Sequence, residues 1–166
     1  KVICDADWKD LLIERLPEIP NFTLLVGWTG QVAITDSLIQ ATEKKRKVAT
    51  DSAFYKEFLA KSHAIVQGLQ SAWNQQDIPA LQEGIHANRA LLNEFAQVMQ
   101  LEIETPALQT LCNLAEQNGA CAKTSGAGGG DCGICFTPNE TQRQQIETQW
   151  AKAQIQVLPL SIAEAW

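Results

Sequence analysis

Hydrophobic positions recur along the chain at two different spacings, which predicts a mixture of strands and helices. A compact hydrophobic run over 22–28 contains aromatic and β-branched residues and ends among glycines, so it favours a strand. Two longer stretches, 51–77 and 81–99, place hydrophobic residues three or four positions apart, which is typical of helices packed on one side. The repeating positions are Phe54, Phe58, Ile65, Leu69 and Trp73 in the first stretch and Leu81, Ile85, Leu92, Phe95 and Met99 in the second.

Capping residues predict three further helices. Thr35 or Asp36 can begin a helix that runs to about Lys47, where cations suit the negative end of the helix dipole. Thr105 followed by Pro106 predicts a helix that ends at 118–119. A break at 137–139 then starts a helix with buried positions at Ile146, Trp150 and Ala153.

Short hydrophobic runs supply the remaining strands. We expect strands at 11–16 and 132–136, and a last one over 155–162 at a sheet edge, because Pro159 has no N–H to donate. These elements do not alternate as βαβ units. The order predicts an α+β domain over 1–166 in which helices pack on one face of a mostly antiparallel sheet.

Composition narrows the range of partners. The net charge of −6 argues against a nucleic-acid-binding surface, which gathers lysine and arginine on one face. The sequence shows no signal peptide and no hydrophobic run long enough to cross a bilayer, so we expect a cytoplasmic protein without a membrane partner. Because the chain begins at Lys1 instead of methionine, we also expect it to be part of a longer polypeptide.

The chain contains five cysteines, an odd number that favours free thiols in a reducing compartment. Cys132 and Cys135 have the spacing of a redox pair or of half a zinc site. A redox pair needs a helix N-terminus, however, and Cys112 and Cys121 do not form a second pair at metal spacing. We therefore interpret the cysteines as small buried hydrophobic residues and predict no metal site.

The most distinctive stretch is 122–134, which reads Ala-Lys-Thr-Ser-Gly-Ala-Gly-Gly-Gly-Asp-Cys-Gly-Ile. Glycines leave backbone N–H groups uncovered, so such a loop can form a concavity that accepts phosphate oxygens. If the preceding segment is extended, Lys123 and Ser125 share one face and add a cation and a hydroxyl. The alternative is a flexible connector, which the abrupt return to a hydrophobic run disfavours. The stretch is neither a P-loop nor a dinucleotide fingerprint.

Asn88 and Arg89 form a second candidate group. Asn88 lies on the hydrophobic stripe of its helix, where an unpaired amide would cost about 1–3 kcal/mol. It therefore either ties two helices together or contacts a ligand. Arg89 beside it can offer a bidentate fork to a phosphate.

The glycine-rich stretch resembles the C-terminal glycine motif of the GHMP kinases, and three other passages agree with that family in order. They are 25–30 (Leu-Val-Gly-Trp-Thr-Gly), Asn88-Arg89, and 103–106 (Ile-Glu-Thr-Pro). The resemblance covers nearly the whole chain and implies the ferredoxin-like C-terminal domain of these kinases. It is strongest to the members that act on 5-phosphomevalonate.

The resemblance implies transfer of a phosphoryl group from ATP, with Mg²⁺, to 5-phosphomevalonate in the mevalonate pathway of isoprenoid biosynthesis. It implies that Asp131 fixes the glycine loop and that Asn88 and Arg89 are candidates for substrate contact. The phosphate-binding residues would be Lys123, Ser125, Gly126, Ala127, Gly128, Gly129 and Gly130. Alternatives are mevalonate kinase, diphosphomevalonate decarboxylase, or a stand-alone phosphate-binding regulatory module.

Parts of the family pattern are missing. GHMP kinases carry an ATP-binding Gly-Leu-Gly-Ser-Ser loop and their catalytic lysine and aspartate in an N-terminal domain, and nothing in this chain matches them. We therefore expect no catalytic residue in this chain, ATP and Mg²⁺ bound mainly by a separate N-terminal domain, and no kinase activity from the chain alone. Ile34 and Asp36 also stand where relatives have hydroxyls, which puts any contact at these positions in doubt.

Overall fold

The computed structural model describes residues 16–20, 22–32, 53–126 and 128–160. Within these ranges the elements follow one another in the order β1 (Thr23–Trp28), α2 (Ala53–Gln75), α3 (Ile78–Met99), α4 (Pro106–Gln117), β2 (Cys121–Thr124), β3 (Cys132–Thr137), α5 (Glu140–Lys152) and β4 (Gln156–Val157). The predicted helix over 35–47 lies outside the described residues, as does the predicted strand over 11–16 apart from Leu16.

The strands form one antiparallel sheet in the order β2-β3-β1-β4. The central ladder pairs β1 with β3 from Thr23↔Thr137 to Trp28↔Cys132. As predicted, the last strand lies at an edge, but it is shorter than expected. Leu158 still donates its N–H to the Val26 carbonyl at 2.9 Å, and Pro159 then ends the pairing because it has no N–H.

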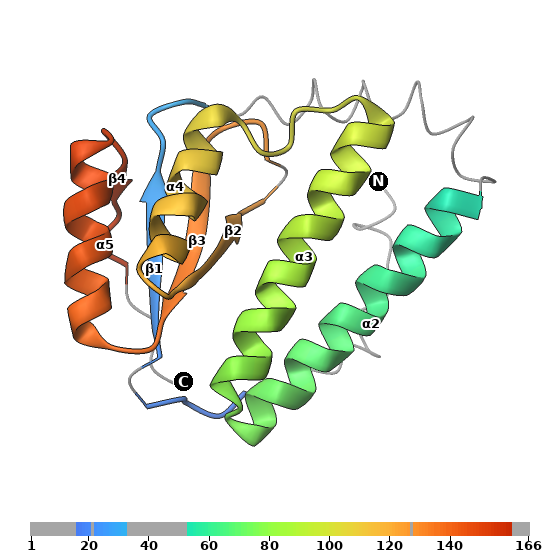
Figure 1. The fold of residues 1–166 in the computed structure, drawn as a ribbon, viewed down its shortest axis with the longest axis horizontal. Coiled ribbons are helices and arrows are strands. Elements are labelled where there is room, and N and C mark those ends of the chain that lie inside the picture. The colour runs from blue at the N-terminus through green and yellow to red at the C-terminus, as the bar shows by residue number, and fades with distance from the viewer. Residues whose placement is uncertain (1–15, 21, 33–52, 127, 161–166) are drawn as a thin grey trace, which may run out of the picture.

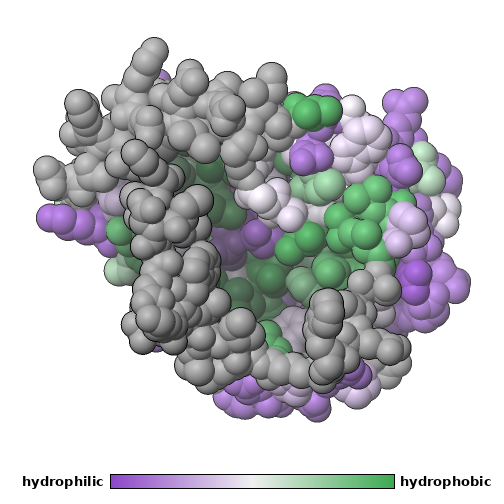
Figure 2. Space-filling model, turned by 180° about the vertical axis from the view of Figure 1, so that it is seen from behind, coloured by the Kyte–Doolittle hydropathy of each residue, from purple (hydrophilic) through white to green (hydrophobic). Residues whose placement is uncertain are grey.

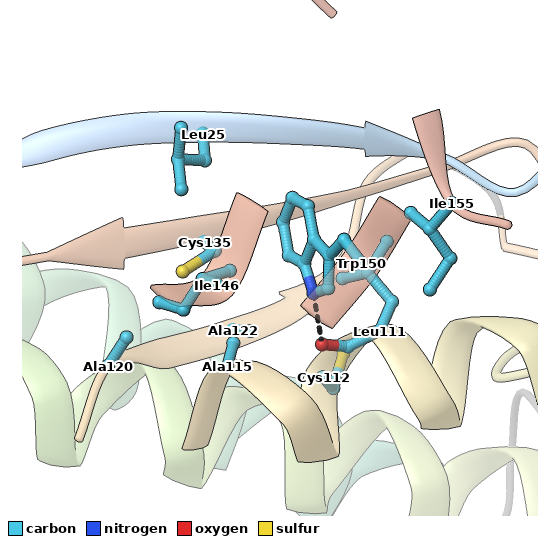
Figure 3. Close-up of a cluster of buried hydrophobic side chains, with 10 residues drawn as sticks. All are labelled: Leu25, Leu111, Cys112, Ala115, Ala120, Ala122, Cys135, Ile146, Trp150 and Ile155. Atoms are coloured by element: carbon cyan, nitrogen blue, oxygen red, sulfur yellow. Dashed lines mark hydrogen bonds between the residues drawn. The ribbon is translucent and has the colours of Figure 1, made fainter. Parts of the chain in front are cut away.

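Helices α4 and α5 cover one face of this sheet, which confirms the predicted α+β arrangement (Figure 1). Thr105 caps α4 and Asn139 caps α5, each accepting a hydrogen bond from a backbone N–H inside the helix. Figure 3 shows the core between helices and sheet, where the indole of Trp150 is fully buried. The core residues are Leu25, Leu111, Cys112, Ala115, Ala120, Ala122, Cys135, Ile146, Trp150 and Ile155.

Helices α2 and α3 form an antiparallel hairpin that lies along the β2 edge of the sheet (Figure 1). Asp77 caps α3 by accepting a hydrogen bond from the Ala80 N–H at 3.1 Å. Near the connection, Ala72 and Leu81 join Cys121 of the sheet in a second buried cluster. At the other end, Phe58 of α2 packs on Phe95 of α3 with ring centroids 4.4 Å apart. The hairpin therefore packs beside the sheet, at its β2 edge.

The face of the sheet opposite α4 and α5 is hydrophobic and only half buried. The residues of β1 and β3 that alternate with the core positions point to this face. Figure 2, seen from behind, shows hydrophobic side chains gathered over these strands. The half-buried hydrophobic residues are Leu24, Val26, Trp28, Ile134 and Phe136.

Cys112, Cys121 and Cys135 are buried, as predicted, whereas Cys132 is only half buried and Cys4 lies outside the described residues. Burial raises the pKa of Cys112 to about 12 and that of Cys121 to about 11, and it also raises the pKa of Cys135. Because Cys132 and Cys135 are three residues apart on one strand, their side chains lie on opposite faces of the sheet. Among the described residues, no group of three His, Cys, Asp or Glu side chains is placed to hold a metal ion.

None of the helices in the described part of the chain is both long enough and apolar enough to cross a bilayer.

Candidate phosphate-binding loop

The glycine-rich stretch forms the connection between β2 and β3. The N–H of Ser125 donates to the Cys132 carbonyl at 3.0 Å and closes the base of this hairpin. Residues 128–130 and Asp131 all have positive φ, between 60° and 126°. Such a run of left-handed backbone is accessible mainly to glycine, which explains why the loop has so few side chains.

The loop is anchored on two sides. On one side the Gly129 N–H donates to the Ile103 carbonyl at 2.8 Å, and a Cβ at Gly128 would lie 2.4 Å from that oxygen. On the other side the Asp131 N–H donates to the Gln31 carbonyl at 2.7 Å. Gly128 and Gly130 are buried. The loop is therefore packed between the segment before α4 and the segment after β1.

Several N–H groups of the loop are not used by these anchors. Those of Gly126, Gly128 and Gly130 make no hydrogen bond to any residue that the structure describes. Backbone amides without an internal partner are suited to phosphate oxygens. The loop thus combines a fixed geometry with N–H donors that none of the described residues occupies.

Lys123 lies on β2 beside this loop. The strand alternates as predicted, since Ala122 joins the core under α4 while Cys121 joins the second cluster. Lys123 is half buried, and its Nζ donates to the Thr124 carbonyl at 2.7 Å. Burial lowers the pKa of Lys123. Within the described residues its ammonium has no carboxylate partner, so a half-buried positive charge is left for an anion.

Asp131 fixes the loop through its backbone. Its carbonyl accepts hydrogen bonds from the N–H of Thr29 at 2.9 Å and from the Thr29 hydroxyl at 3.0 Å. Among the described residues, its carboxylate contacts the Cys132 thiol, with 3.7 Å between Oδ1 and Sγ. The positive φ turns the Asp131 side chain outward, and the residue is exposed.

The guanidinium of Arg89 binds two acidic side chains. Its Nε and Nη2 donate to the two oxygens of Glu104 at 2.9 and 2.6 Å, and its Nη1 lies 2.8 Å from a Glu116 oxygen. Burial would raise the pKa of Glu104, but hydrogen bonds from Arg89 and Asn93 outweigh it, so the pKa is lowered. The predicted bidentate fork thus exists, but Glu104 occupies it in this structure.

Within the part of the chain that the structure describes, Asn88 does not tie two helices together. It is half buried, and its side chain makes no hydrogen bond to another described residue. Arg89, the next residue along α3, connects this helix to α4 through its ion pair with Glu116. The possible contact of Asn88 with a ligand stays a prediction.

Sequence reasoning gave no role to the residues that anchor the loop, namely Thr29, Gln31, Ile103 and Glu104. Thr29, Ile103 and Glu104 belong to passages that matched the family, but no local pattern indicates that a carbonyl will receive a distant N–H. The structure brings the family-matching passages together: residues 29 and 103 contact the loop, and Arg89 binds Glu104, the neighbour of Ile103 in the chain.

One described cavity, of about 300 Å³, lies away from the loop. It is lined by Thr23, Arg143 and residues 157–160, at the end of the sheet opposite the loop.

Comparison with known proteins agrees with this geometry. Residues 65–156 match the family model described as GHMP kinases C terminal. The chain is 36% identical over 160 residues to phosphomevalonate kinase from Streptomyces sp. (strain CL190), an alignment that covers 95% of this chain and 42% of that protein.

Solved structures agree as well. The Lin0012 protein from Listeria innocua superposes with a TM-score of 0.83 at 34% identity, covering 89% of this chain and 41% of that one. Streptococcus pneumoniae phosphomevalonate kinase in complex with phosphomevalonate and AMPPNP gives a TM-score of 0.70 at 30% identity, covering 81% of this chain and 37% of that one. The chain therefore spans less than half the length of these relatives. Because the family model matches more than half of the chain, and the sheet, the helices and the glycine loop agree with it, the chain belongs to the GHMP kinase family, in its C-terminal region.

Proposed function

We propose that this chain is the C-terminal part of an ATP-dependent phosphomevalonate kinase, which converts 5-phosphomevalonate to 5-diphosphomevalonate in isoprenoid biosynthesis. The observation that carries the proposal is the doubly anchored glycine loop, some of whose N–H groups bind no described residue, in a chain 36% identical to a phosphomevalonate kinase over 95% of its length.

The chemistry of such a transfer explains what the loop does. An oxygen of the acceptor phosphate attacks the γ-phosphorus of ATP, the bond to the bridging oxygen breaks, and ADP leaves. The protein mainly positions the reactants and neutralises charge. In this proposal the amides of 126–130 hold phosphate oxygens, Lys123 adds a positive charge, and Ser125 adds a hydroxyl. Asp131 fixes the loop, and Asn88 is a candidate for contact with the substrate.

ATP and Mg²⁺ belong to the proposal as cofactors. The structure of the Streptococcus pneumoniae relative is a complex with AMPPNP, an ATP analogue, which supports ATP as the donor. Mg²⁺ supplies charge neutralisation at the transferring phosphates. The described residues offer no carboxylate cluster for it, so we place Mg²⁺ with ATP on the part of the protein that this chain does not contain.

That remaining part is the proposed partner of this domain. The curated relative is more than twice as long as the matched region. We propose that an N-terminal ATP-binding domain of the same protein completes the active site in the cytoplasm, and that neither nucleic acid nor a membrane is involved. The half-buried hydrophobic face of the sheet supports a packing partner of this kind (Figure 2).

The test is an assay of ADP release by the complete protein, with 5-phosphomevalonate, mevalonate and diphosphomevalonate offered separately. We expect turnover with 5-phosphomevalonate only, and none from the 166-residue chain alone. Turnover with mevalonate would favour mevalonate kinase instead, and phosphate release with loss of CO₂ from diphosphomevalonate would favour the decarboxylase. Binding of phosphate without turnover of any substrate would favour a regulatory module.

Lys123→Met in the complete protein tests the loop directly. We expect this variant to lose at least about tenfold in kcat/KM, because a preorganised charge at the phosphate is removed. Lys152→Met is the matched control, since Lys152 is an exposed lysine at the end of α5. Equal activity of both variants would remove Lys123 from the site.

A further inference from the structure

The guanidinium of Arg89 on α3 is bound by side chains of α4 and of the segment before it. Its guanidinium meets Glu104, Glu116 and Asn113, and the Arg89 and Glu104 side chains are only 12% and 6% exposed. Glu104 also accepts a hydrogen bond from Asn93 at 3.1 Å. Because Arg89 and Asn93 are one turn apart on α3, the carboxylate is held at two points of the same helix face.

The position of Glu104 determines that of the Ile103 carbonyl. This carbonyl is part of the peptide group that joins the two residues, and that group is planar, so it cannot move independently of the Glu104 backbone. The same oxygen accepts the Gly129 N–H at 2.8 Å and limits how closely Gly128 can approach. A continuous set of contacts therefore runs from α3 through Glu104 to the glycine loop.

A buried ion pair of this kind contributes little net free energy to folding. Its desolvation cancels much of its attraction, and hydrophobic replacements of both partners are often neutral. What a bidentate pair does provide is a fixed relative geometry.

We propose that Arg89 is a positioning residue for phosphoryl transfer: through Glu104 it sets the position of the Ile103 carbonyl, and thereby the arrangement of the N–H groups at 128–130. The inference rests on the proposed function of the loop and gives Arg89 a role that requires no contact with substrate.

The test compares variants of the complete protein. Arg89→Met breaks the pair. If this single variant fails to fold, Arg89→Met combined with Glu104→Met removes both buried charges and leaves only the more exposed carboxylate of Glu116 without its arginine. The control is Arg143→Met, because Arg143 also joins two glutamates, Glu140 and Glu147, but lies on α5. Two properties are measured: hydrogen–deuterium exchange of a peptide spanning 124–132 without substrate, and kcat and KM for ATP-dependent transfer.

We expect the Arg89 variants to exchange faster at 124–132, and to lose about 10–100-fold in kcat with less than about threefold change in KM, as a misplaced catalytic group does. Arg143→Met should change neither property. A folded double variant with wild-type exchange overturns the proposed contact route, and faster exchange with unchanged kcat overturns the role in transfer. If the unmodified protein transfers no phosphate, the proposed function is overturned, and the exchange measurement alone still decides whether Arg89 orders the loop.

Discussion

The indole N–H of Trp150 on α5 donates to the main-chain carbonyl of Leu111 on α4 at 3.0 Å, inside the core (Figure 3). Both side chains also fill the space left by two glycines that pair across β1 and β3. A Cβ at Gly27 would lie 2.8 Å from Trp150, and one at Gly133 would lie 2.6 Å from Leu111. The contact thus joins both helices to the centre of the sheet.

Replacing Trp150 by phenylalanine should destabilise the domain by about 2–3 kcal/mol, because a buried hydrogen bond is lost and a cavity remains. Urea denaturation measures the change. Trp73→Phe is the control: Trp73 also donates to a carbonyl, that of Pro17 at 2.7 Å, but it is only half buried. We expect a smaller loss there, and an equal loss would contradict the importance of the Trp150 contact.

Two glycine-to-alanine changes should act with opposite sign. Gly133→Ala places a methyl group against Leu111 and should destabilise the protein by about 1–3 kcal/mol through overpacking. Gly68→Ala lies on α2, where a Cβ meets nothing within 4 Å, and should stabilise it by up to about 1 kcal/mol through helix propensity. Thermal unfolding distinguishes the two, and stabilisation by both would show that the core can accommodate the methyl group.

Gly128→Ala should impair catalysis in the complete protein more than Gly126→Ala does. Both residues have positive φ, 77° and 70°, so backbone strain is similar. Only at Gly128 would a Cβ meet the Ile103 carbonyl, and we expect a loss of at least about tenfold in kcat as the loop shifts. Steady-state kinetics with ATP and 5-phosphomevalonate check this. Similar rates for the two variants would argue against a requirement for this close approach.

The stability of the domain should depend on pH through Lys123, whose pKa is lowered from 10.5 by burial. Between the folded pKa and 10.5 the unfolded chain binds more protons, so stability rises with pH in that window. Lys123→Met should therefore be more stable than the unmodified protein at pH 7, and the difference should shrink as the pH approaches 10.5.

Urea midpoints from pH 7 to 10.5 measure this difference. Lys61→Met is a control of opposite sign, because the hydrogen bond from Lys61 to Glu57 raises the Lys61 pKa. That variant is expected to be slightly less stable at pH 7. A Lys123→Met variant less stable than the unmodified protein at neutral pH would contradict the assigned cost of burial.

Local signals predicted much of the fold. The caps Thr105 and Asn139 begin helices where expected, since a side-chain oxygen that pairs a free N–H acts within a few residues. Hydrophobic spacing predicted the two long helices, α2 and α3, but not their packing as a hairpin. The last strand was predicted too long, because hydrophobic character continues past Pro159 whereas strand pairing does not.

The amino-acid sequence by itself determined the helices and strands of the described residues and a loop whose backbone is accessible mainly to glycine, because these depend on neighbours in the chain. Tertiary structure decided which carbonyls receive the loop N–H groups and where Arg89 points. Gly129 and Ile103 are 26 positions apart, and Arg89 and Glu104 are 15 apart. Contacts at such separations depend on how the helices pack against the sheet, and no local pattern carries that information.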